Sequence, residues 1–416
     1  MATIQPFRAL RPNSFYADGL IFPGDEQVFY FGIGEKEHPL MPLKTQLEAP
    51  ARIRPETAEG QEQAYREIRE SLECLLKLER IRKDEQPGIY IYEIVHRNYR
   101  QTGIWAMTSI RDFFDGKIKL HEHTIADSER RISNYLKQTG LEGSPVLLTY
   151  QPDMTINRII AETCANTRKS TVGNRKSLHR IWKIEDSETL RKITAAFTQV
   201  ETVYMADGHH RLASTARLAL ESGSDEYISS LYIATDQLRI IEFYRVVIPD
   251  TAVNDADLFS RLGELFTIVP SEGNLPVKPA SANILGICIH GKWHELHAKS
   301  PATLDVVLLQ DEILAKVFQI NDPRNDTRLK CIGGENAMEE TLALLKAEPS
   351  SIAFTLFPMS VKQLISAADA GQILPPKSTW IDPKVPYGLL MYQHATVGYG
   401  LPETQKSEQY NSNGHK

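Results

Sequence analysis

The fold is decided by residues 203–223, which read VYMADGHHRLASTARLALESG. The first of these residues are apolar and predict a short buried strand, and the apolar pattern after the histidines predicts a helix. Gly208 allows an abrupt turn between the two elements, because glycine adopts backbone conformations that other residues avoid. Gly223 is well placed as the C-terminal cap of the helix. The stretch therefore predicts a strand, a tight turn and a helix.

The segments on either side mix strands with helices. Residues 89–96 and 102–110 alternate in polarity, are rich in aromatic residues and are joined by the polar RNYRQ, which predicts a β-hairpin. Residues 59–83 have apolar positions three or four apart and predict an amphipathic helix. Further strands are expected at 27–33, 146–150, 177–184, 230–235, 239–247, 283–297 (a pair), 351–357 and 387–394, and further helices at 156–167, 187–200, 305–318, 335–347 and 361–370. Because hairpins recur among the helices, the order favours an α+β fold over a doubly wound parallel sheet.

The composition is that of an ordinary globular protein. The chain has 416 residues, of which 42% are apolar and 24% charged, and its formal net charge is −6. These values are close to the globular average and exclude disordered, collagen-like and coiled-coil classes. A mildly acidic chain also lacks the basic footprint of nucleic-acid-binding proteins, so no nucleic-acid partner is expected.

The cysteines and the N-terminal residues bear on the compartment. The 4 cysteines are far apart and no pair has CxxC spacing, so neither a zinc ribbon nor a redox dithiol is expected. Sparse thiols of this kind suit a reducing cytosol. The N-terminus, MATIQPFRALRPNSF, has Arg and Pro where a signal peptide has an apolar core. We therefore expect a cytoplasmic protein without a membrane partner.

The length predicts two to three domains at about 150 residues each. The pattern of elements changes after the Pro-Asp step at 249–250, which is the best candidate boundary. We expect residues 1–250 to form one domain that carries the 203–223 stretch, and residues 251–400 to form a C-terminal α+β domain that packs on it. The polar residues 401–416 are expected to form a disordered tail.

The turn at 207–211 carries the sharpest chemical signal. A helix that begins there presents backbone N–H groups and a positive dipole end, which together form an anion site. Gly208 permits close approach of a ligand, His209 and His210 add donors, and Arg211 can hold a phosphate through two hydrogen bonds. Ser214, one turn further on, can add a hydroxyl. These residue types in this order favour a phosphate or nucleotide site.

Asp207 leaves two interpretations open at the same turn. It can hold a metal ion or orient one of the imidazoles, or it can be an ordinary helix cap beside surface histidines. A zinc site is the weaker alternative, because adjacent histidines do not easily chelate one ion and further ligands are not evident.

Two other clusters are candidates. Glu122, in KLHEHT, can serve as a general base or a metal ligand, although HEHT does not have the HExxH spacing of a metalloprotease. The alternative there is a solvated strand end whose salt bridges involve residues 127–131. Lys377, Ser378 and Thr379, in PPKSTWIDPK, can contact an anion, but they lack the glycine frame of a phosphate-binding loop of the Walker A type.

The clusters together resemble a known family. The segments, in chain order, are PFRALRP (6–12), KLHEHT (119–124), YMADGHHR (204–211), LQDEIL (309–314), INDPRNDTRLKCIGG (320–334) and PPKSTWIDPK (375–384). On these segments the sequence is similar to the family catalogued as domain of unknown function one thousand and fifteen, of the ParB/sulfiredoxin-like superfamily. The resemblance runs from about residue 6 to residue 394. It implies a ParB/sulfiredoxin-like N-terminal catalytic core with a mixed sheet, followed by a C-terminal α+β part.

The resemblance also implies an activity. Members of the superfamily bind nucleotide or polyphosphate at the turn that is 207–211 here, and its kinases phosphorylate free L-serine. It therefore implies a kinase-like phosphotransferase acting between pyrophosphate or a nucleotide (ADP or ATP) and L-serine or O-phosphoserine, with Mg2+ as a cofactor. Such a reaction needs neutralised phosphate charge, an aligned hydroxyl and a carboxylate that takes the proton. The resemblance implies catalytic roles for Asp25, Glu122, Asp207 and His209.

The sequence also departs from the family pattern. Where the family has Pro-Tyr-Asp-Val, residues 23–26 read Pro-Gly-Asp-Glu. Ser128 replaces a Lys, and Tyr244 and Arg245 stand where His-Arg is usual. The residues expected to bind phosphate match the family pattern, whereas the residues expected near the acceptor substrate differ from it. The alternative function is therefore a ParB-like regulatory protein that binds a nucleotide or another anion without catalysis.

Overall fold

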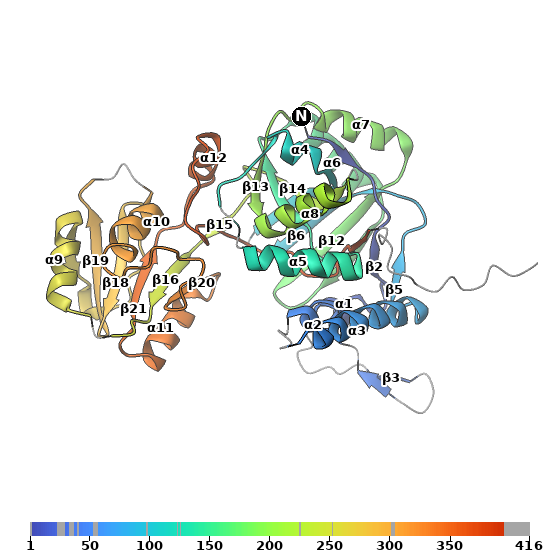
Figure 1. Ribbon diagram of the computed structural model, residues 1–416. Helices are drawn as coiled ribbons and strands as arrows, with labels where there is room; N and C mark the ends of the chain where they lie inside the picture. The colour runs from blue at the N-terminus through green and yellow to red at the C-terminus, as the bar shows by residue number, and fades with distance from the viewer. Residues whose placement is uncertain are drawn as a thin grey trace, which may run out of the picture.

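The computed structural model describes residues 2–22, 30–32, 37–39, 41–52, 57–96, 99–122, 124, 126–223, 226–251, 253–300 and 304–394. Two of the sequence predictions, the catalytic role of Asp25 and the tail at 401–416, lie outside these residues. Figure 1 shows a larger body built on one sheet and a smaller body built on a second sheet, with the last part of the chain running back from the second to the first.

The first sheet is mixed and has nine strands, in the order β11–β12–β6–β7–β14–β10–β13–β8, with β1 paired to β7. Its strands are β1 (Ile4–Gln5), β6 (Ile89–His96), β7 (Tyr99–Ser109), β8 (Ile118–Lys119), β10 (Val146–Tyr150), β11 (Lys169–Gly173), β12 (Ser177–Ile184), β13 (Val203–Asp207) and β14 (Tyr227–Ala234). Strand β10 runs parallel to β14 and β13 runs parallel to β8, while the other pairs are antiparallel. Strand β13 therefore lies near one edge of the sheet, covered only by the short β8.

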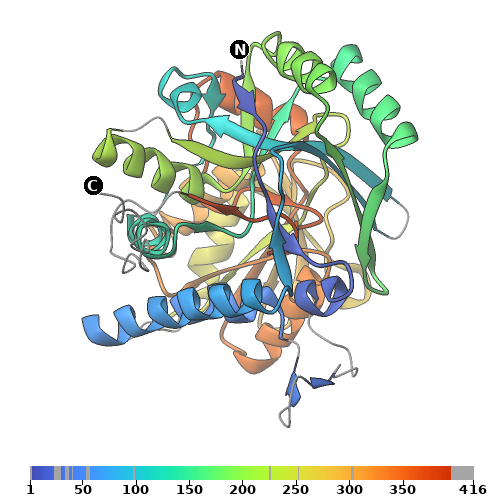
Figure 2. The same cartoon turned by 90° about the vertical axis from the view of Figure 1, so that its right-hand side faces the viewer.

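Two apolar cores pack on this sheet. One joins strand residues such as Ile91 and Leu148 with side chains of α6 (Met154–Asn166), α7 (Ser187–Phe197) and α8 (His209–Ser222). The other joins Tyr92 and Trp105 with the long helix α3 (Ala58–Lys77) and the N-terminal segment. Helix α5 (Ala126–Thr139) packs along α8 and also contacts α3 (Figure 2). These layers hold the start of α8 rigidly at the end of β13.

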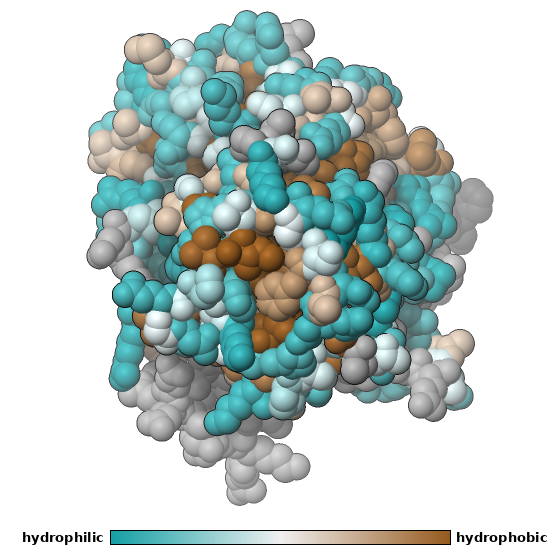
Figure 3. All heavy atoms as spheres, turned by 90° about the vertical axis from the view of Figure 1, so that its left-hand side faces the viewer, coloured by the Kyte–Doolittle hydropathy of each residue, from teal (hydrophilic) through white to brown (hydrophobic). Residues whose placement is uncertain are grey.

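The second sheet is antiparallel, in the order β17–β19–β18–β21–β16–β20. Its strands are β16 (Phe243–Val247), β17 (Phe266–Pro270), β18 (Ile284–Ile289), β19 (Lys292–Ala298), β20 (Leu329–Gly333) and β21 (Ile352–Leu356), and its helices are α9 (Asp255–Leu265), α10 (Asp305–Leu308) with the π-helical turn η3 (Leu309–Leu314), and α11 (Ala337–Ala347). Figure 3 shows the outer side of this body as mostly hydrophilic, with an apolar area near its centre. Nothing in the structure indicates a partner for that area.

The last part of the chain connects the two sheets. Helix α12 (Val361–Asp369) places Asp369 against the first sheet, where its carboxylate accepts from Lys119 Nζ at 2.6 Å and Tyr204 Oη at 3.0 Å. Tyr204 also belongs to the apolar core of the second sheet, so the two bodies share buried side chains. Beyond α12, strand β22 (Trp380–Ile381) pairs with β15 (Ile240–Ile241), and β23 (Tyr392–Gln393) pairs with β9 (Leu141–Glu142). Residues 374–384 therefore run past the end of β13.

The remaining elements are short. They are β2 (Leu10–Pro12), β3 (Tyr30–Gly32), β4 (Glu37–Pro39), β5 (Ile81–Lys83), α1 (Ala17–Ile21), η1 (Lys44–Glu48), α2 (Ala49–Arg52), α4 (Arg111–Phe114) and η2 (Glu272–Asn274). In the part of the chain that the structure describes, no helix is both long and apolar enough to cross a bilayer.

The structure confirms the α+β class, the hairpin of β6 and β7, and the strand, turn and helix at 203–223. The helix predicted at 59–83 ends at Lys77, and the chain continues as β5. The strand predicted at 387–394 is wrong except for β23, because residues 387–390 turn instead of extending. The alternative interpretation of residues 127–131 as part of a strand end is wrong. These residues belong to α5, a helix that was not predicted from the sequence.

The division at 250 remains a prediction. The structure adds two facts that bear on it. Strand β16 of the second sheet begins at Phe243, before the predicted boundary. Leu389, Leu390 and Met391, beyond the second sheet in the chain, are buried in the core of the first body.

Candidate functional site

The strand, turn and helix at 203–223 form the frame of the candidate site. Strand β13 ends at Asp207, and Gly208 has φ +102° as the residue that precedes α8. A Cβ atom at Gly208 would lie 2.9 Å from both Arg211 Nη2 and Val146 Cγ1, so the turn needs glycine for its conformation and for space. The N–H groups of Arg211 and Leu212 both donate to the Gly208 carbonyl oxygen, at 2.9 Å and 3.0 Å, and close the first turn of the helix. A helix N-terminus carries a positive dipole end, which favours a bound anion.

Asp207 lies between two cations. Its Oδ2 accepts from Arg211 Nη2 at 2.9 Å, and its Oδ1 accepts from Lys384 Nζ at 2.6 Å. Burial raises the pKa of Asp207, but the charges of Lys384 and Arg211 outweigh burial and hold it below its usual value. Lys384 Nζ also lies 5.0 Å from the centroid of the Trp380 ring. Asp207 is therefore ionised and orients both cations at the turn.

Two buried histidines meet behind the turn. The rings of His121 and His209 are perpendicular, with centroids 4.6 Å apart, and the side chains are 0% and 6% exposed. Burial lowers the pKa of His121 to about 4, against a weak opposing effect of the Met205 backbone. Burial, followed by the unfavourable proximity of a second protonatable ring in His121, holds the pKa of His209 well below its usual value. Among the described residues, both ring nitrogens of His121 and Nε2 of His209 lack a well-formed hydrogen bond. Both imidazoles are therefore neutral and retain unused polar atoms.

Glu122 provides a second carboxylate next to this turn. It follows β8, forms a parallel bridge with Leu374 and is 9% exposed. Burial raises its pKa, while a hydrogen bond from the Lys377 backbone and the charges of Lys377 and Arg245 oppose the rise. The net shift is upward, so Glu122 is a better proton acceptor than an exposed carboxylate.

Lys377 reaches the same site from the C-terminal segment. Its φ is +63°, a conformation that residues other than glycine adopt at a cost. Its charge lowers the pKa of His209 and of His210, although burial is the larger effect for both. Lys377 therefore lies among Glu122 and the two histidines of the turn.

The structure places the other predicted residues less favourably for phosphate contact. Ser214 is fully buried, and its hydroxyl lies 2.7 Å from the carbonyl oxygen of His210 and 3.0 Å from that of Glu129. In this conformation it joins α8 to α5 and points away from the turn. Ser378 Oγ donates to the carbonyl oxygen of Pro375, and Thr379 is half-buried. These three hydroxyls stay predictions as phosphate contacts.

Three residues of the site were not predicted from the sequence. His121 adjoins Glu122 in KLHEHT, Lys384 ends PPKSTWIDPK, and Arg245 was noted only as part of a departure from the family pattern. His121 and Lys384 stand within segments that carry the family resemblance and Arg245 does not, but for none of the three did the spacing along the chain indicate a place in the site. Arg245 comes from β16, so the second sheet contributes directly to the site.

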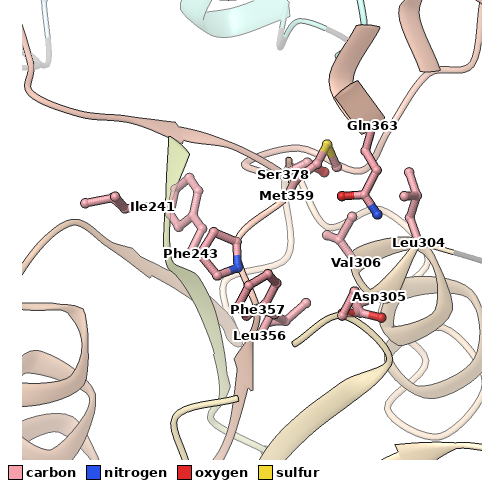
Figure 4. Close-up of a pocket in the computed structure, with 12 residues that line it drawn as sticks. Ile241, Phe243, Leu304, Asp305, Val306, Leu356, Phe357, Met359, Gln363 and Ser378 are labelled. Carbon is pink, nitrogen blue, oxygen red and sulfur yellow. The ribbon is translucent and has the colours of Figure 1, made fainter. Parts of the chain in front are cut away.

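Two hollows in the described part of the chain are lined by residues outside the turn at 207–211. A cavity of about 30 Å³ lies beside Ser378 and is lined by Phe243, Asp305, Met359 and Gln363 (Figure 4). This volume holds about one water molecule, so the cavity is too small for a substrate. A shallow hollow of about 440 Å³ lies near Tyr99 and Arg239. No group of three or more metal-ligating side chains occurs among the residues that the structure describes.

The family can now be stated on the whole sequence. Residues 4–317 match the family described as Protein of unknown function (DUF1015). The chain belongs to this family. The match confirms the resemblance based on the quoted segments, and it includes the turn at 207–211 and Glu122 but not the segment 375–384. No curated protein matches the sequence.

Three solved structures are similar at low identity. A conserved hypothetical protein from Pyrococcus furiosus is 13% identical, with a TM-score of 0.38 and coverage of 69% of this chain and 94% of that chain. A free serine kinase in complex with AMP is 13% identical, with a TM-score of 0.38 and coverage of 70% and 92%. SbnI from Staphylococcus aureus, truncated at its C-terminus, is 12% identical, with a TM-score of 0.39 and coverage of 68% and 85%.

Proposed function

We propose that this protein is a small-molecule phosphotransferase, which moves a phosphoryl group between pyrophosphate or a nucleotide and the hydroxyl of free L-serine or a related hydroxy amino acid. The observation that carries the proposal is the meeting of Arg211, Lys384 and Lys377 with the buried Glu122 at the N-terminal end of α8. Phosphoryl transfer needs this combination, because its catalysis depends on charge neutralisation and on alignment of the attacking hydroxyl.

The donor phosphates would lie at the N-terminal end of α8. There the backbone N–H groups, Arg211 and Lys377 would neutralise their charge. His209 is neutral and can donate or accept a hydrogen bond through Nε2, which lacks a well-formed partner in the described structure. Asp207 keeps Arg211 and Lys384 in place when no substrate is bound. Its negative charge also repels a phosphate group, so a phosphate would have to contact both cations to bind. The turn therefore favours ligands with several phosphate oxygens.

The acceptor chemistry would use Glu122. In the forward step the hydroxyl oxygen forms a bond to the transferred phosphorus, the bridging P–O bond of the donor breaks, and Glu122 takes the hydroxyl proton. Its raised pKa suits this role, because a proton acceptor works best when its pKa approaches the working pH. Asp25 stays a second candidate for the same role.

Mg2+ would enter the site with the donor. This ion is usually held by one or two carboxylates together with substrate phosphate oxygens and water. Asp207 has both carboxylate oxygens in ion pairs, so the donor phosphates would have to supply most of the ligands. When bound, the ion would supply charge neutralisation between the two phosphates.

Phosphorus NMR tests the proposal. Purified protein, MgCl2 and L-serine are mixed with pyrophosphate, ADP, ATP or CTP in separate samples, and a phosphoserine signal is expected with one donor. The variant Glu122→Gln should lower the rate by about 100-fold or more, the range of general base catalysis. Glu93→Gln is the matched control, since Glu93 is also buried but lies on β6, four strands from β13 in the sheet. A folded sample that transfers no phosphate from any donor, and equally no signal in reverse from O-phosphoserine, would refute the activity.

One observation favours a second candidate function. The Asp207 carboxylate at the turn is already engaged by two cations. A regulator that binds a nucleotide or anion without transferring phosphate needs only the cationic part of this arrangement. Calorimetry distinguishes the two, because the regulator would bind pyrophosphate or a nucleotide without turnover.

A further inference from the structure

Arg245 is a buried cation in an unusual setting. It lies in the middle of β16, is 2% exposed, and has no carboxylate within ion-pair distance among the described residues. Its guanidinium instead donates to four backbone carbonyl oxygens. Nη1 lies 3.2 Å from Phe243 O and 3.3 Å from Tyr244 O, and Nη2 lies 3.0 Å from Pro376 O and 2.9 Å from Lys377 O. Since burying a charge without compensation is costly, this arrangement calls for a reason.

The two carbonyls bound by Nη2 belong to the loop that carries Lys377. Their contacts hold the peptide groups on either side of Lys377, the residue with positive φ. The same loop lies beside Glu122, because Glu122 and Leu374 form a parallel bridge and the Leu374 N–H donates to the His121 carbonyl oxygen at 2.7 Å. The second sheet thereby sets the geometry of a site whose other residues come from the first sheet.

We propose that Arg245 is a positioning residue of this site, which fixes the peptide groups on either side of Lys377 and so holds this loop beside Glu122, with the Lys377 ammonium group available to a phosphate. The part of the proposal that concerns phosphate rests on the proposed function. The positioning of the Lys377 loop does not, and it can be measured without any substrate.

The test uses NMR of the full chain labelled with 15N at lysine. The Lys377 amide signal is assigned as the one lost in Lys377→Arg. It should shift in Arg245→Met, which removes the hydrogen bonds to the Pro376 and Lys377 carbonyl oxygens and so releases the loop. Thr355→Val is the matched control: it removes a fully buried hydrogen bond of the neighbouring strand β21 and should leave the signal in place. An unchanged Lys377 signal in Arg245→Met would overturn the proposal.

Two further measurements keep the test decisive. If Arg245→Met does not fold, Arg245→Lys replaces it, because lysine keeps the charge but cannot hold four carbonyls in the geometry of a guanidinium fork. Methylguanidinium added to Arg245→Ala should return the Lys377 signal to its wild-type position. If the variant had shifted the signal only by lowering the stability of the protein, methylguanidinium would not reverse the shift. Calorimetry with pyrophosphate should then show about tenfold weaker binding in the Arg245 variant. A shifted signal without any binding of pyrophosphate, ADP, ATP or CTP, in wild type or variant, would leave Arg245 as a positioning residue and refute the proposed function instead.

Discussion

Lys384 Nζ lies 2.6 Å from Asp207 Oδ1, although 177 positions separate the two residues in the sequence. The contact joins the C-terminal segment to the turn that begins α8. It places a cation where the helix N-terminus already favours an anion. Together with Arg211 it makes the turn a concentrated positive site around one carboxylate.

Lys384→Met should weaken pyrophosphate binding by about tenfold, equivalent to about 1.4 kcal/mol. The variant should lose less than about 1 kcal/mol of folding stability, because the ion pair is partly exposed and such pairs contribute little. Calorimetry and thermal unfolding measure the two effects. Lys192→Met, which removes the exposed pair with Glu188, is the control and should leave binding unchanged. Equal pyrophosphate affinity in both variants would show that Lys384 has no part in the site.

Arg211→Ala should weaken donor binding by at least tenfold, because the Arg211 guanidinium lies at the start of α8, paired with Asp207, and can hold a phosphate through two hydrogen bonds. Arg211→Lys should restore only part of the affinity, since an ammonium group cannot make the two parallel hydrogen bonds of a guanidinium. The control is Arg217→Ala on the same helix, where the side chain pairs with Glu221 on the surface. Unchanged affinity for pyrophosphate, ADP and ATP in Arg211→Ala would remove the phosphate-site interpretation.

His121 should make the protein sensitive to acid. Burial lowers its pKa to about 4, so the unfolded chain binds more protons than the native state between about pH 6.5 and pH 4. Stability should therefore fall as the pH falls through this range, by on the order of 3 kcal/mol for this one residue. Urea unfolding at pH 7, 5.5 and 4.5 measures the slope, and His121→Phe should flatten it. A slope that is the same in His121→Phe and wild type would contradict the prediction.

His394 should have the opposite effect at alkaline pH. Its Nε2 lies 2.7 Å from Glu142 Oε1 and its Nδ1 lies 3.4 Å from Glu226 Oε2. Burial lowers the pKa of His394, but the two carboxylates outweigh burial and raise it to about 10. The charged form therefore stabilises the native state fully below about pH 6.5, and this stability is lost as the pH rises through about 10.

The variant His394→Gln tests this. It should unfold at lower urea concentration than wild type at pH 6, by on the order of 2 to 3 kcal/mol, and the difference should shrink between pH 8 and pH 10.5. His290→Gln is the control, because the pair of His290 with Asp255 is well exposed. A stability difference that does not depend on pH would show that His394 acts through packing and not through its charge.

The local sequence pattern was enough to predict the helices and strands whose apolar residues are strongly periodic. The apolar run before Asp207, Gly208 and the helix up to Gly223 were predicted correctly, because each depends on residues next to it in the chain. Helix α5 was not predicted, because its first turn is charged and its apolar residues are few. The face that these residues form is recognised only from its packing against α8. The strand expected at 387–394 failed because residues 387–390 turn over the first body, and burial of Leu389 and Leu390 comes from that tertiary contact.

The sequence by itself determined the family, the α+β class and the glycine turn before α8, because a glycine turn before a helix and the residues within it are local properties. Only the tertiary structure decided which charges meet there. Lys384, Lys377 and Arg245 come from segments more than 30 residues away from the turn, and they reach it because the chain after α12 returns from the second sheet to the first. Charge interactions act through space at a few ångströms, so spacing along the chain gave no sign of them.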